Sequence, residues 1–242
     1  MSIPKKIHYC WFGHGKMPEL TIKCINSWKK YLPDYELILW NEDNFDINMN
    51  KYVKEAYETK HYAFVTDYVR LYALYHHGGI YMDSDVEVLK PLDKFLDHRA
   101  FTGCENEEMC VTGIMAAEKG HKWIEDLLND YNDKKFILPD GSYNKTPNTH
   151  LITEITIDKY GWEPKNEHQI LKEGLNIYPF DVFCAKDWKT GKIMSSGNTY
   201  TIHHFSGSWH TRTHKLKNKI KRIIGPKGTQ FIVNIKKKIK GT

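Results

Sequence analysis

The sequence predicts an α/β domain in which helices cover a central sheet. Short segments rich in β-branched and aromatic residues alternate with segments whose apolar residues recur every three or four positions. Glycine and proline separate consecutive segments. The chain has 242 residues, 40% of them hydrophobic, which is enough material for one core. In open sheets of this kind ligands bind at the carboxyl ends of the strands, so we expect the functional site there.

The first half of the chain shows the alternation most clearly. Its predicted strands are residues 7–12, 35–40 and 80–89, and its predicted helices are residues 19–31, 52–58 and 61–77. Pro33 and Asp34 end the first helix, and Gly78 with Gly79 ends the third. The third helix is followed at once by an apolar strand, which predicts a tight link between the two.

The second half carries fewer signals. Residues 100–103 and 111–116 predict two strands, residues 123–131 predict a helix, and residues 200–202 predict a last strand before a loop of small residues. We expect residues 1–211 to form one domain and residues 212–242 to form a separate tail.

Charge separates these two parts. The tail holds 11 Lys and Arg and no Asp or Glu, so the net charge of +5 leaves residues 1–211 at about −6. Apolar residues at helical spacing among the lysines predict basic amphipathic helices, which suit an anionic membrane surface. Nucleic acid is a weaker alternative, because the tail has few aromatic residues for base stacking and the body is acidic. A solvated or self-packed tail is the other alternative.

The cysteines and the N-terminus predict a location. The five cysteines are odd in number, scattered, and form no C-x-x-C pair, which favours reduced thiols over disulfides or zinc. The sequence shows no signal-peptide pattern and no apolar run long enough to span a bilayer. We expect a cytoplasmic protein that associates peripherally with the inner face of the cell membrane.

Two carboxylates stand close together where the strand of residues 80–89 leaves its apolar stretch. In an extended strand Asp83 and Asp85 point to the same side and Ser84 to the other. Two anions this close repel unless a cation lies between them, and oxygen ligands suit Mg²⁺ or Mn²⁺. A solvated acidic turn is the alternative interpretation.

An acid and a base lie one helical turn apart on the preceding helix. Asp67 and Arg70 share one face of residues 61–77. An ordinary helical ion pair explains them equally well from the sequence alone. However, a helix this apolar should be covered, and a buried pair with spare donors and acceptors can bind hydroxyls or phosphate.

These features together resemble a known family. The sequence AFVTDYVRLYAL of residues 63–74, followed by GGIYMDSD of residues 78–85, is similar to the D-x-x-R…G-G-x-Y-x-D-x-D signature of DXD-containing glycosyltransferases. These are enzymes of glycosyltransferase family 32, of the capsular polysaccharide type, related to the glucosylating domain of large clostridial toxins. IPKKIHYCWFG of residues 3–13 also resembles the opening strand of that family. The resemblance covers roughly residues 3 to 210.

The resemblance implies a GT-A type nucleotide-sugar-binding fold, with a mixed central sheet flanked by helices, and a role for each matching residue. By position, Trp11 corresponds to the tryptophan that stacks on the nucleotide base. The remaining matches are to donor-sugar contacts (Asp67, Arg70), to ribose and sugar contacts (Tyr81, Asp83) and to a direct metal ligand (Asp85).

The family ends its site with a metal ligand, two residues, a serine, one residue and a tryptophan. Aligning Trp209 with that tryptophan places His204 at the metal ligand and Gly207 at the serine. The glycine departs from the family pattern, although Ser206 and Ser208 adjoin it. Imidazole is a good Mn²⁺ ligand, and the Trp209 indole N–H can donate to a donor phosphate. The alternative is that His203 and His204 are simply one buried and one exposed residue of a strand.

Two other polar groups have less specific interpretations. Asn148 resembles the family residue that precedes a helix at the donor pocket, and equally resembles a helix N-cap. Glu105, Glu107 and Glu108 either edge an acceptor cleft or are simply solvated.

The resemblance implies a metal-dependent, retaining hexosyltransferase. Its cofactors are Mn²⁺ or Mg²⁺ and a nucleotide-sugar donor, with a UDP-sugar favoured over GDP-mannose, and its acceptor is a saccharide or lipid-linked saccharide in capsular or surface polysaccharide synthesis. The alternatives are a haloacid-dehalogenase-type phosphatase with Asp83 as nucleophile, and a non-catalytic carbohydrate-binding module. The phosphatase fits less well, because its motif normally opens the first strand.

Overall fold

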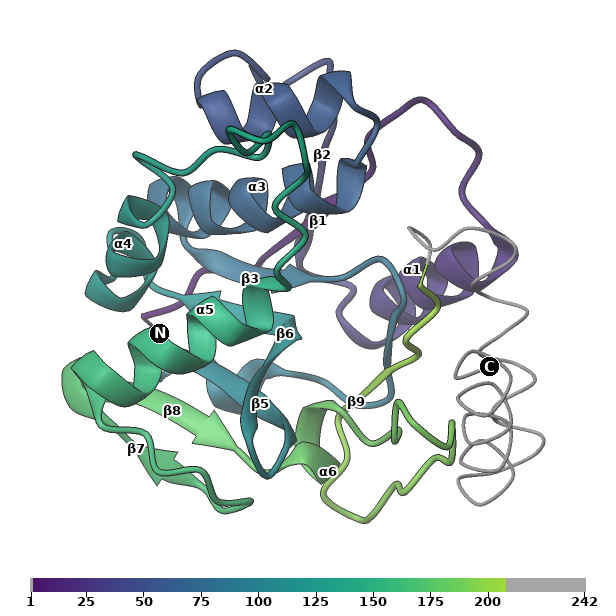
Figure 1. Cartoon of the computed structure of the whole chain (residues 1–242). Coiled ribbons are helices and arrows are strands. Elements are labelled where there is room, and N and C mark those ends of the chain that lie inside the picture. The colour runs from purple at the N-terminus through teal and green to yellow at the C-terminus, as the bar shows by residue number, and fades with distance from the viewer. Residues whose placement is uncertain (1, 208–242) are drawn as a thin grey trace, which may run out of the picture.

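The computed structural model describes residues 2–207, apart from the side chains of Val111 and Thr112. The predicted tail of residues 212–242 and the candidate residues Ser208 and Trp209 lie outside the described residues. In the described chain the helices and strands alternate as predicted in the first half (Figure 1).

A mixed sheet forms the centre of the described chain. Its order is β2-β1-β3-β6-β5-β8-β7, with β1 parallel to β2 and β3, and with β6 antiparallel to both β3 and β5. A second, two-stranded sheet pairs β4 with β9. The strands are β1 Lys6–Cys10, β2 Glu36–Trp40, β3 Gly79–Met82, β4 Val86–Val88, β5 Ala100–Asn106, β6 Met109–Ala117, β7 Gln169–Ile170, β8 Leu175–Tyr178 and β9 Thr201–His203.

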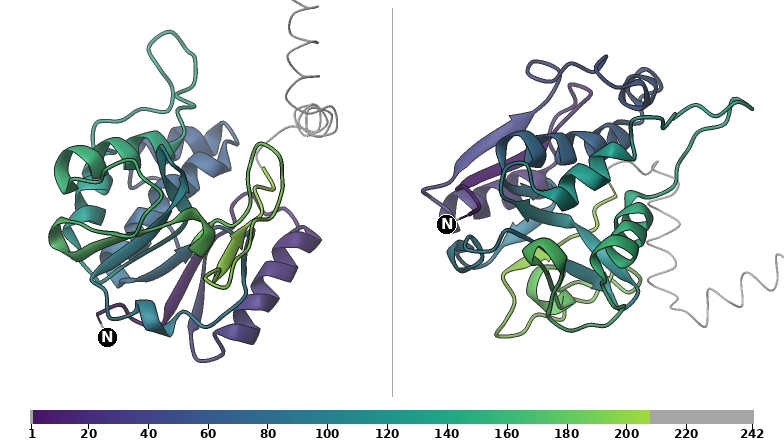
Figure 2. Two further views of the ribbon diagram at one scale, coloured as in Figure 1. Left: turned by 90° about the horizontal axis from the view of Figure 1, so that it is seen from below. Right: turned by 90° about the vertical axis from the view of Figure 1, so that its left-hand side faces the viewer.

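Helices cover both faces of the main sheet, as the views in Figure 2 show. Side chains of α2, α3, α4 and α5 form the core on one face, and those of α1, α6 and the small sheet form the core on the other. The α-helices are α1 Glu19–Tyr31, α2 Lys51–Glu58, α3 Tyr62–His77, α4 Lys122–Asn129, α5 Asn148–Ile155 and α6 Phe180–Phe183. Short helices of other types span Asp93–Phe95, Thr156–Tyr160 and Lys172–Gly174.

Strand β3 shows how the sequence pattern produces these layers. All of its residues are buried, and successive side chains enter opposite cores: Ile80 and Met82 lie on the α1 side and Tyr81 on the α3 side. Such burial on both faces is typical of a central strand. The predicted fold class, an α/β domain with a mixed central sheet flanked by helices, is confirmed.

The prediction of one continuous strand over residues 80–89 is wrong. The chain leaves the main sheet after Met82, turns through residues 83–85, and re-enters a different sheet as β4. The Val86 N–H donates to the Asp83 carbonyl across this turn, at 2.9 Å. The turn moves the chain from the end of a buried strand to a second pairing partner, β9.

Two glycines bring α3 close to β3. Gly78 and Gly79 have φ values of +63° and +117°, which other residues adopt only with strain. A Cβ atom would also lie 2.7 Å from the Lys119 nitrogen at Gly78 and 2.8 Å from the Lys6 oxygen at Gly79. This link therefore fixes where the side chains of α3 meet the end of β3.

All five cysteines are buried, and none of them forms a disulfide in the described chain. Among the described residues no helix is long and apolar enough to cross a membrane.

A buried histidine on β1, His8, holds the Gly78 link to the main sheet. The Trp40 Nε1–H donates to His8 Nδ1 at 3.1 Å, so His8 Nε2 carries the proton and donates to the Gly78 carbonyl at 2.8 Å. Burial lowers the pKa of His8 to about 4, because it disfavours the charged imidazolium, and the hydrogen bond to the Gly78 carbonyl opposes this only in part.

We predict that this histidine makes the fold sensitive to acid. The pKa of His8 is lower in the folded chain than the usual 6.5, so stability is full above pH 6.5 and falls as the pH drops toward 4. The expected loss from this residue between pH 7 and pH 4 is about 3 kcal/mol. Urea unfolding of the wild type and of His8→Gln over this range measures it. The curve of the variant should be flatter, and two parallel curves would contradict the assignment.

Candidate functional site

A buried arginine organises the carboxyl end of β3. Arg70 Nη2 lies 3.2 Å from Asp67 Oδ1 on its own helix and 3.2 Å from Asp83 Oδ1 beyond β3. Its guanidinium also lies over the Tyr81 ring, 4.6 Å from the centroid. The Tyr81 hydroxyl donates to Asp83 Oδ1 at 3.0 Å. Asp67 and Arg70 of α3 and Asp83, which follows β3, therefore form one cluster.

This cluster holds more negative than positive charge. The Arg70 side chain is 5% exposed, and Asp67 and Asp83 are 12% and 22% exposed. Burial raises the pKa of Asp67 to about 6, although Arg70 opposes this rise. Burial also raises the pKa of Asp83, against the attraction of Arg70 and His203. A site where buried carboxylates resist ionisation favours a ligand that brings positive charge or hydroxyl donors.

A second cluster adjoins the first through Asp83. Side-chain ligand atoms of Asp83, Asp85 and His203 all lie within 4.8 Å of one another. His203 Nε2 is 3.3 Å from Asp85 Oδ1 and 3.8 Å from Asp83 Oδ2. The Ser206 N–H donates to Asp85 Oδ2 at 2.7 Å, which orients that carboxylate.

The electrostatics of this second cluster fit a divalent cation. Burial acts to raise the pKa of Asp85, but attraction and hydrogen bonding from His203 and Ser206 hold it below its usual value. Burial acts to lower the pKa of His203, and Asp85 raises it well above the usual value. The imidazolium supplies positive charge to the two carboxylates, and a divalent cation would supply it in place of that proton, because imidazole binds a metal in its neutral form. Two carboxylates and an imidazole are a donor set suited to Mn²⁺ or Mg²⁺, so the residues fit such an ion.

The structure differs from the prediction in the histidine that it brings to the aspartates. His203 faces them, whereas the predicted ligand, His204, points to Glu87, with its Nε2 2.7 Å from Glu87 Oε2. The cause is the pairing of β9 with β4, which sets His203 opposite Val86. Adjacent strand residues point to opposite sides, so only one of the two histidines can face the turn. The His204 N–H still contributes, because it donates to the Asp85 carbonyl at 3.0 Å.

Asp83 and Asp85 converge for a different reason from the one predicted. They flank a turn and do not alternate along a strand. The Asp83 N–H remains tied to the main sheet through the Gly113 carbonyl at 2.8 Å, while the Asp85 carbonyl pairs with the start of the loop after β9. The turn thus places one carboxylate against Arg70 and both against His203.

The remaining described candidates lie in adjoining loops and helices. Trp11 follows β1 and is half-buried, and its Nε1–H donates to the Gly15 carbonyl at 2.6 Å. Asn148 is the first residue of α5, and Pro147 is the N-cap, so the N-cap interpretation of Asn148 is wrong. The Nδ2 atom of Asn148 is buried and has no hydrogen-bond partner within the described chain. Neither residue takes part in the two clusters above, so their nucleotide and sugar contacts stay predictions.

Sequence reasoning missed Gly113, which makes room for His203. A Cβ atom at Gly113 would lie 2.8 Å from His203 Nδ1 and 3.0 Å from its Cγ. The signal was available, because an isolated glycine inside a strand often marks a close approach of another group.

The sequence of this region matches a known family. Residues 18–102, which include α3, β3 and the Asp83 turn, match the family described as "Glycosyltransferase sugar-binding region containing DXD motif". The match is confined to these residues of the 242-residue chain. The match favours a transferase over the phosphatase and binding-module alternatives.

Individual relatives are similar over part of their length. The chain is 29% identical over 141 residues to "Inositol phosphoceramide mannosyltransferase 3" of Schizosaccharomyces pombe, covering 53% of this chain and 37% of that protein. It is 27% identical over 174 residues to "Subversion of eukaryotic traffic protein A" of Legionella pneumophila, covering 57% of this chain and 26% of that protein. The chain thus spans well under half the length of each of these two relatives.

Among solved structures, "PaToxG Glycosyltransferase" is similar with a TM-score of 0.49 and 17% identity, covering 65% of this chain and 69% of that one.

We predict that Gly113→Ala destabilises the protein through His203. The three atoms nearest to the added methyl group all belong to the His203 ring, and overpacking of this kind costs about 1–3 kcal/mol. In a His203→Ala background the same substitution should cost much less, because the clashing ring is gone. A double-mutant cycle by urea unfolding measures the coupling. An equal cost in both backgrounds would show that the ring does not depend on the space at Gly113.

Proposed function

We propose that the protein is a metal-dependent glycosyltransferase that moves a hexose from a nucleotide-sugar donor to a saccharide acceptor. The observation that carries this proposal is the junction of two clusters at Asp83. One cluster, Asp67 with Arg70, offers buried donors and acceptors for sugar hydroxyls. The other, Asp85 with His203, offers ligands for a divalent cation. A sugar diphosphate needs both kinds of partner within one site.

The residues have distinct roles in this proposal. Asp83, Asp85 and His203 would hold Mn²⁺ or Mg²⁺, which when bound neutralises the charge of the leaving diphosphate. Arg70 orients Asp83 through their ion pair, and Asp67 accepts hydrogen bonds from the hexose. Trp11, at the carboxyl end of β1, would stack on the base, and the ring of Tyr81 supports the guanidinium.

The donor and the stereochemistry follow from family resemblance. We propose a UDP-sugar as the favoured donor. GDP-mannose is the alternative, because three matched relatives are mannosyltransferases by name. We also propose that the anomeric configuration is retained. The acceptor then attacks the donor sugar from the same face from which the leaving phosphate departs. A role in capsular or surface polysaccharide synthesis fits the resemblance described above.

We predict that Asp85→Asn lowers transfer by at least about 100-fold, since the change removes one anionic ligand while keeping the size of the side chain. The assay measures hydrolysis and transfer with UDP-glucose, UDP-galactose, UDP-N-acetylglucosamine and GDP-mannose in the presence of Mn²⁺. Asp158→Asn, at an exposed aspartate, is the matched control.

Several outcomes of this assay would contradict the proposal. These are no turnover of any donor by the wild type, full activity of Asp85→Asn, or full activity in EDTA. Proton NMR of the wild-type product reports the anomer, and an inverted linkage would contradict retention.

We further propose that residues 212–242 bind an anionic membrane surface and present a lipid-linked acceptor to the site. The support is the charge of the tail, with 11 basic residues and no acidic ones. Each basic residue near an anionic bilayer contributes about 1 kcal/mol. Co-sedimentation with phosphatidylserine vesicles should therefore pull down the full chain in a salt-sensitive way, and much less of a chain ending at Thr211. Equal binding of both chains would disprove this role.

A further inference from the structure

Two groups that face the acids lie on the short segment at the end of β9. His203 is the last residue of that strand, and the Ser206 N–H donates to Asp85 Oδ2 at 2.7 Å. Only His204 and Phe205 separate them along the chain. Whatever fixes these two residues therefore also fixes the imidazole and the amide of the second cluster.

His204 is held in three directions. Its N–H donates to the Asp85 carbonyl at 3.0 Å, and its carbonyl accepts from Lys186 Nζ at 2.9 Å. Its ring Nε2 lies 2.7 Å from Glu87 Oε2, where the ring N–H donates, since an ionised carboxylate can only accept. The side chains of His204 and Glu87 are 12% and 17% exposed. The residue is thus tied to the Asp85 turn, to the segment between α6 and β9, and to β4.

Glu87 is itself anchored on its other side. It lies on β4 opposite Ile202 of β9, and Lys23 Nζ of α1 is 2.9 Å from its Oε1 and 3.0 Å from its Oε2. The carboxylate therefore accepts from two side chains at once. Helix α1, strand β4 and the segment after β9 meet at this one group.

Phe205 shows that the segment after β9 is held under strain. Its φ of +52° is a left-handed conformation, which is unfavourable for a residue with a Cβ and persists only where its surroundings impose it. Its ring lies against the His203 ring, with the centroids 4.1 Å apart and the planes inclined by 33°. Release of His204 would let Phe205 relax, and would move both the imidazole and the Ser206 amide away from the acids.

The pairing of β4 with β9 does not need the contact between Glu87 and the His204 ring. The ladder pairs run from Val88 with Thr201 to Val86 with His203, and all of them precede His204. The ring therefore adds its contact at the first residue beyond the ladder, beside the acids. This position favours a role in the site over a role in strand pairing.

We propose that Glu87 and His204 are positioning residues of the cation site. They hold residues 203–206 in the strained conformation that aims His203 and the Ser206 N–H at the acids. This inference rests on the proposed function and adds to it how the site is held. The His204 ring contacts Glu87 and is not a ligand of the ion.

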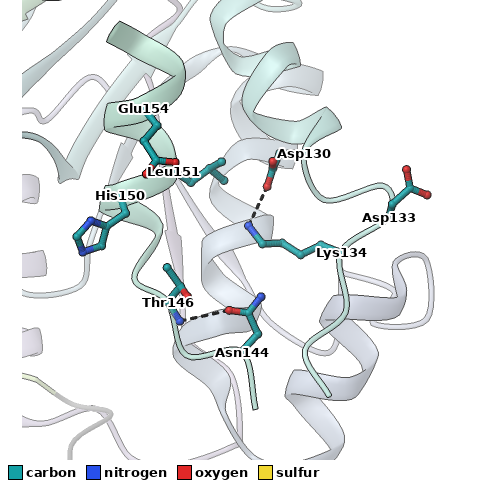
Figure 3. Close-up of a pocket in the computed structure, with 8 residues that line it drawn as sticks. All are labelled: Asp130, Asp133, Lys134, Asn144, Thr146, His150, Leu151 and Glu154. Atoms are coloured by element: carbon teal, nitrogen blue, oxygen red, sulfur yellow. Dashed lines mark hydrogen bonds and ion pairs between the residues drawn. The ribbon is translucent and has the colours of Figure 1, made fainter. Parts of the chain in front are cut away.

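Three substitutions test the pair. Glu87→Ala removes the acceptor, whereas Glu87→Gln keeps an oxygen that accepts from His204 Nε2. His204→Leu removes the ring donor but keeps both backbone contacts of the residue, and it carries the test if Glu87→Ala does not fold. Asp130→Ala is the matched control, because it also takes a carboxylate away from a lysine at 2.8 Å. That ion pair lies in a surface hollow beside α5 whose lining residues belong to neither cluster (Figure 3).

Electron paramagnetic resonance of unbound Mn²⁺ measures the affinity of the full chain for the ion in the presence of UDP. Glu87→Ala and His204→Leu should raise the dissociation constant about tenfold, since partners that orient metal ligands are typically worth about 10–100-fold. Glu87→Gln should stay within about threefold of the wild type, and the control should be unchanged.

A purely structural pair would behave differently. Its loss would lower the free energy of unfolding in urea and leave the Mn²⁺ affinity of the folded protein unchanged. That outcome, or an equal loss of affinity in the control or in Glu87→Gln, would overturn the inference. The nitrogen coupling of bound Mn²⁺ in pulsed resonance should persist in His204→Leu, because His203 supplies it. Its disappearance would make His204 a ligand and would also overturn the inference.

Hydrogen exchange of the Ser206 amide, followed by NMR without metal, tests the same positioning without the ion. Exchange should be at least about tenfold faster in Glu87→Ala while the amides of β3 stay protected, because the segment after β9 then opens locally. Equal protection in the wild type and Glu87→Ala would contradict the inference. A wild type that binds no Mn²⁺ would count against the proposed function, and the Ser206 amide would still decide whether Glu87 and His204 hold the segment.

Discussion

The buried guanidinium of Arg70 is the interaction on which the site depends. It is the cation that joins α3 to the turn after β3, because Asp67 and Asp83 both lie 3.2 Å from its Nη2 atom. Removing one partner of a buried ion pair leaves an uncompensated charge, which typically costs about 3–5 kcal/mol of stability. Substitution of Arg70 or of either carboxylate partner should therefore lower the stability of the fold. Its position is set in turn by the Gly78–Gly79 link, which His8 holds to the sheet.

The cluster also holds more negative than positive charge, and this excess makes it suitable for a ligand. Asp67 has its pKa raised to about 6 by burial even with Arg70 beside it. A core designed only for stability would replace such acids by apolar residues at little cost. Here the acids are kept at the carboxyl end of a central strand, where α/β sheets bind ligands. The distribution of burial and charge thus points to binding.

Local patterns predicted the parts of this site that depend on sequence neighbours. The helical face with Asp67 and Arg70, the glycine link and the paired acids Asp83 and Asp85 all follow from spacing. The turn at residues 83–85 does not follow from spacing. The chain leaves the main sheet there because β4 pairs with β9, more than 100 residues further along the sequence. The same pairing decides that His203 and not His204 faces the acids. Register between distant strands is a tertiary property that periodicity within one segment cannot give.

The central claim is that Asp83, Asp85 and His203 hold a divalent cation beside the Arg70 cluster. A crystal grown with Mn²⁺ and UDP, with anomalous data collected at the manganese edge, tests it most directly. The account predicts an anomalous peak at about 2.0–2.3 Å from oxygen or nitrogen atoms of these three residues, with the diphosphate on its open side. A nucleotide bound without such a peak, or a peak at other ligands, would contradict it.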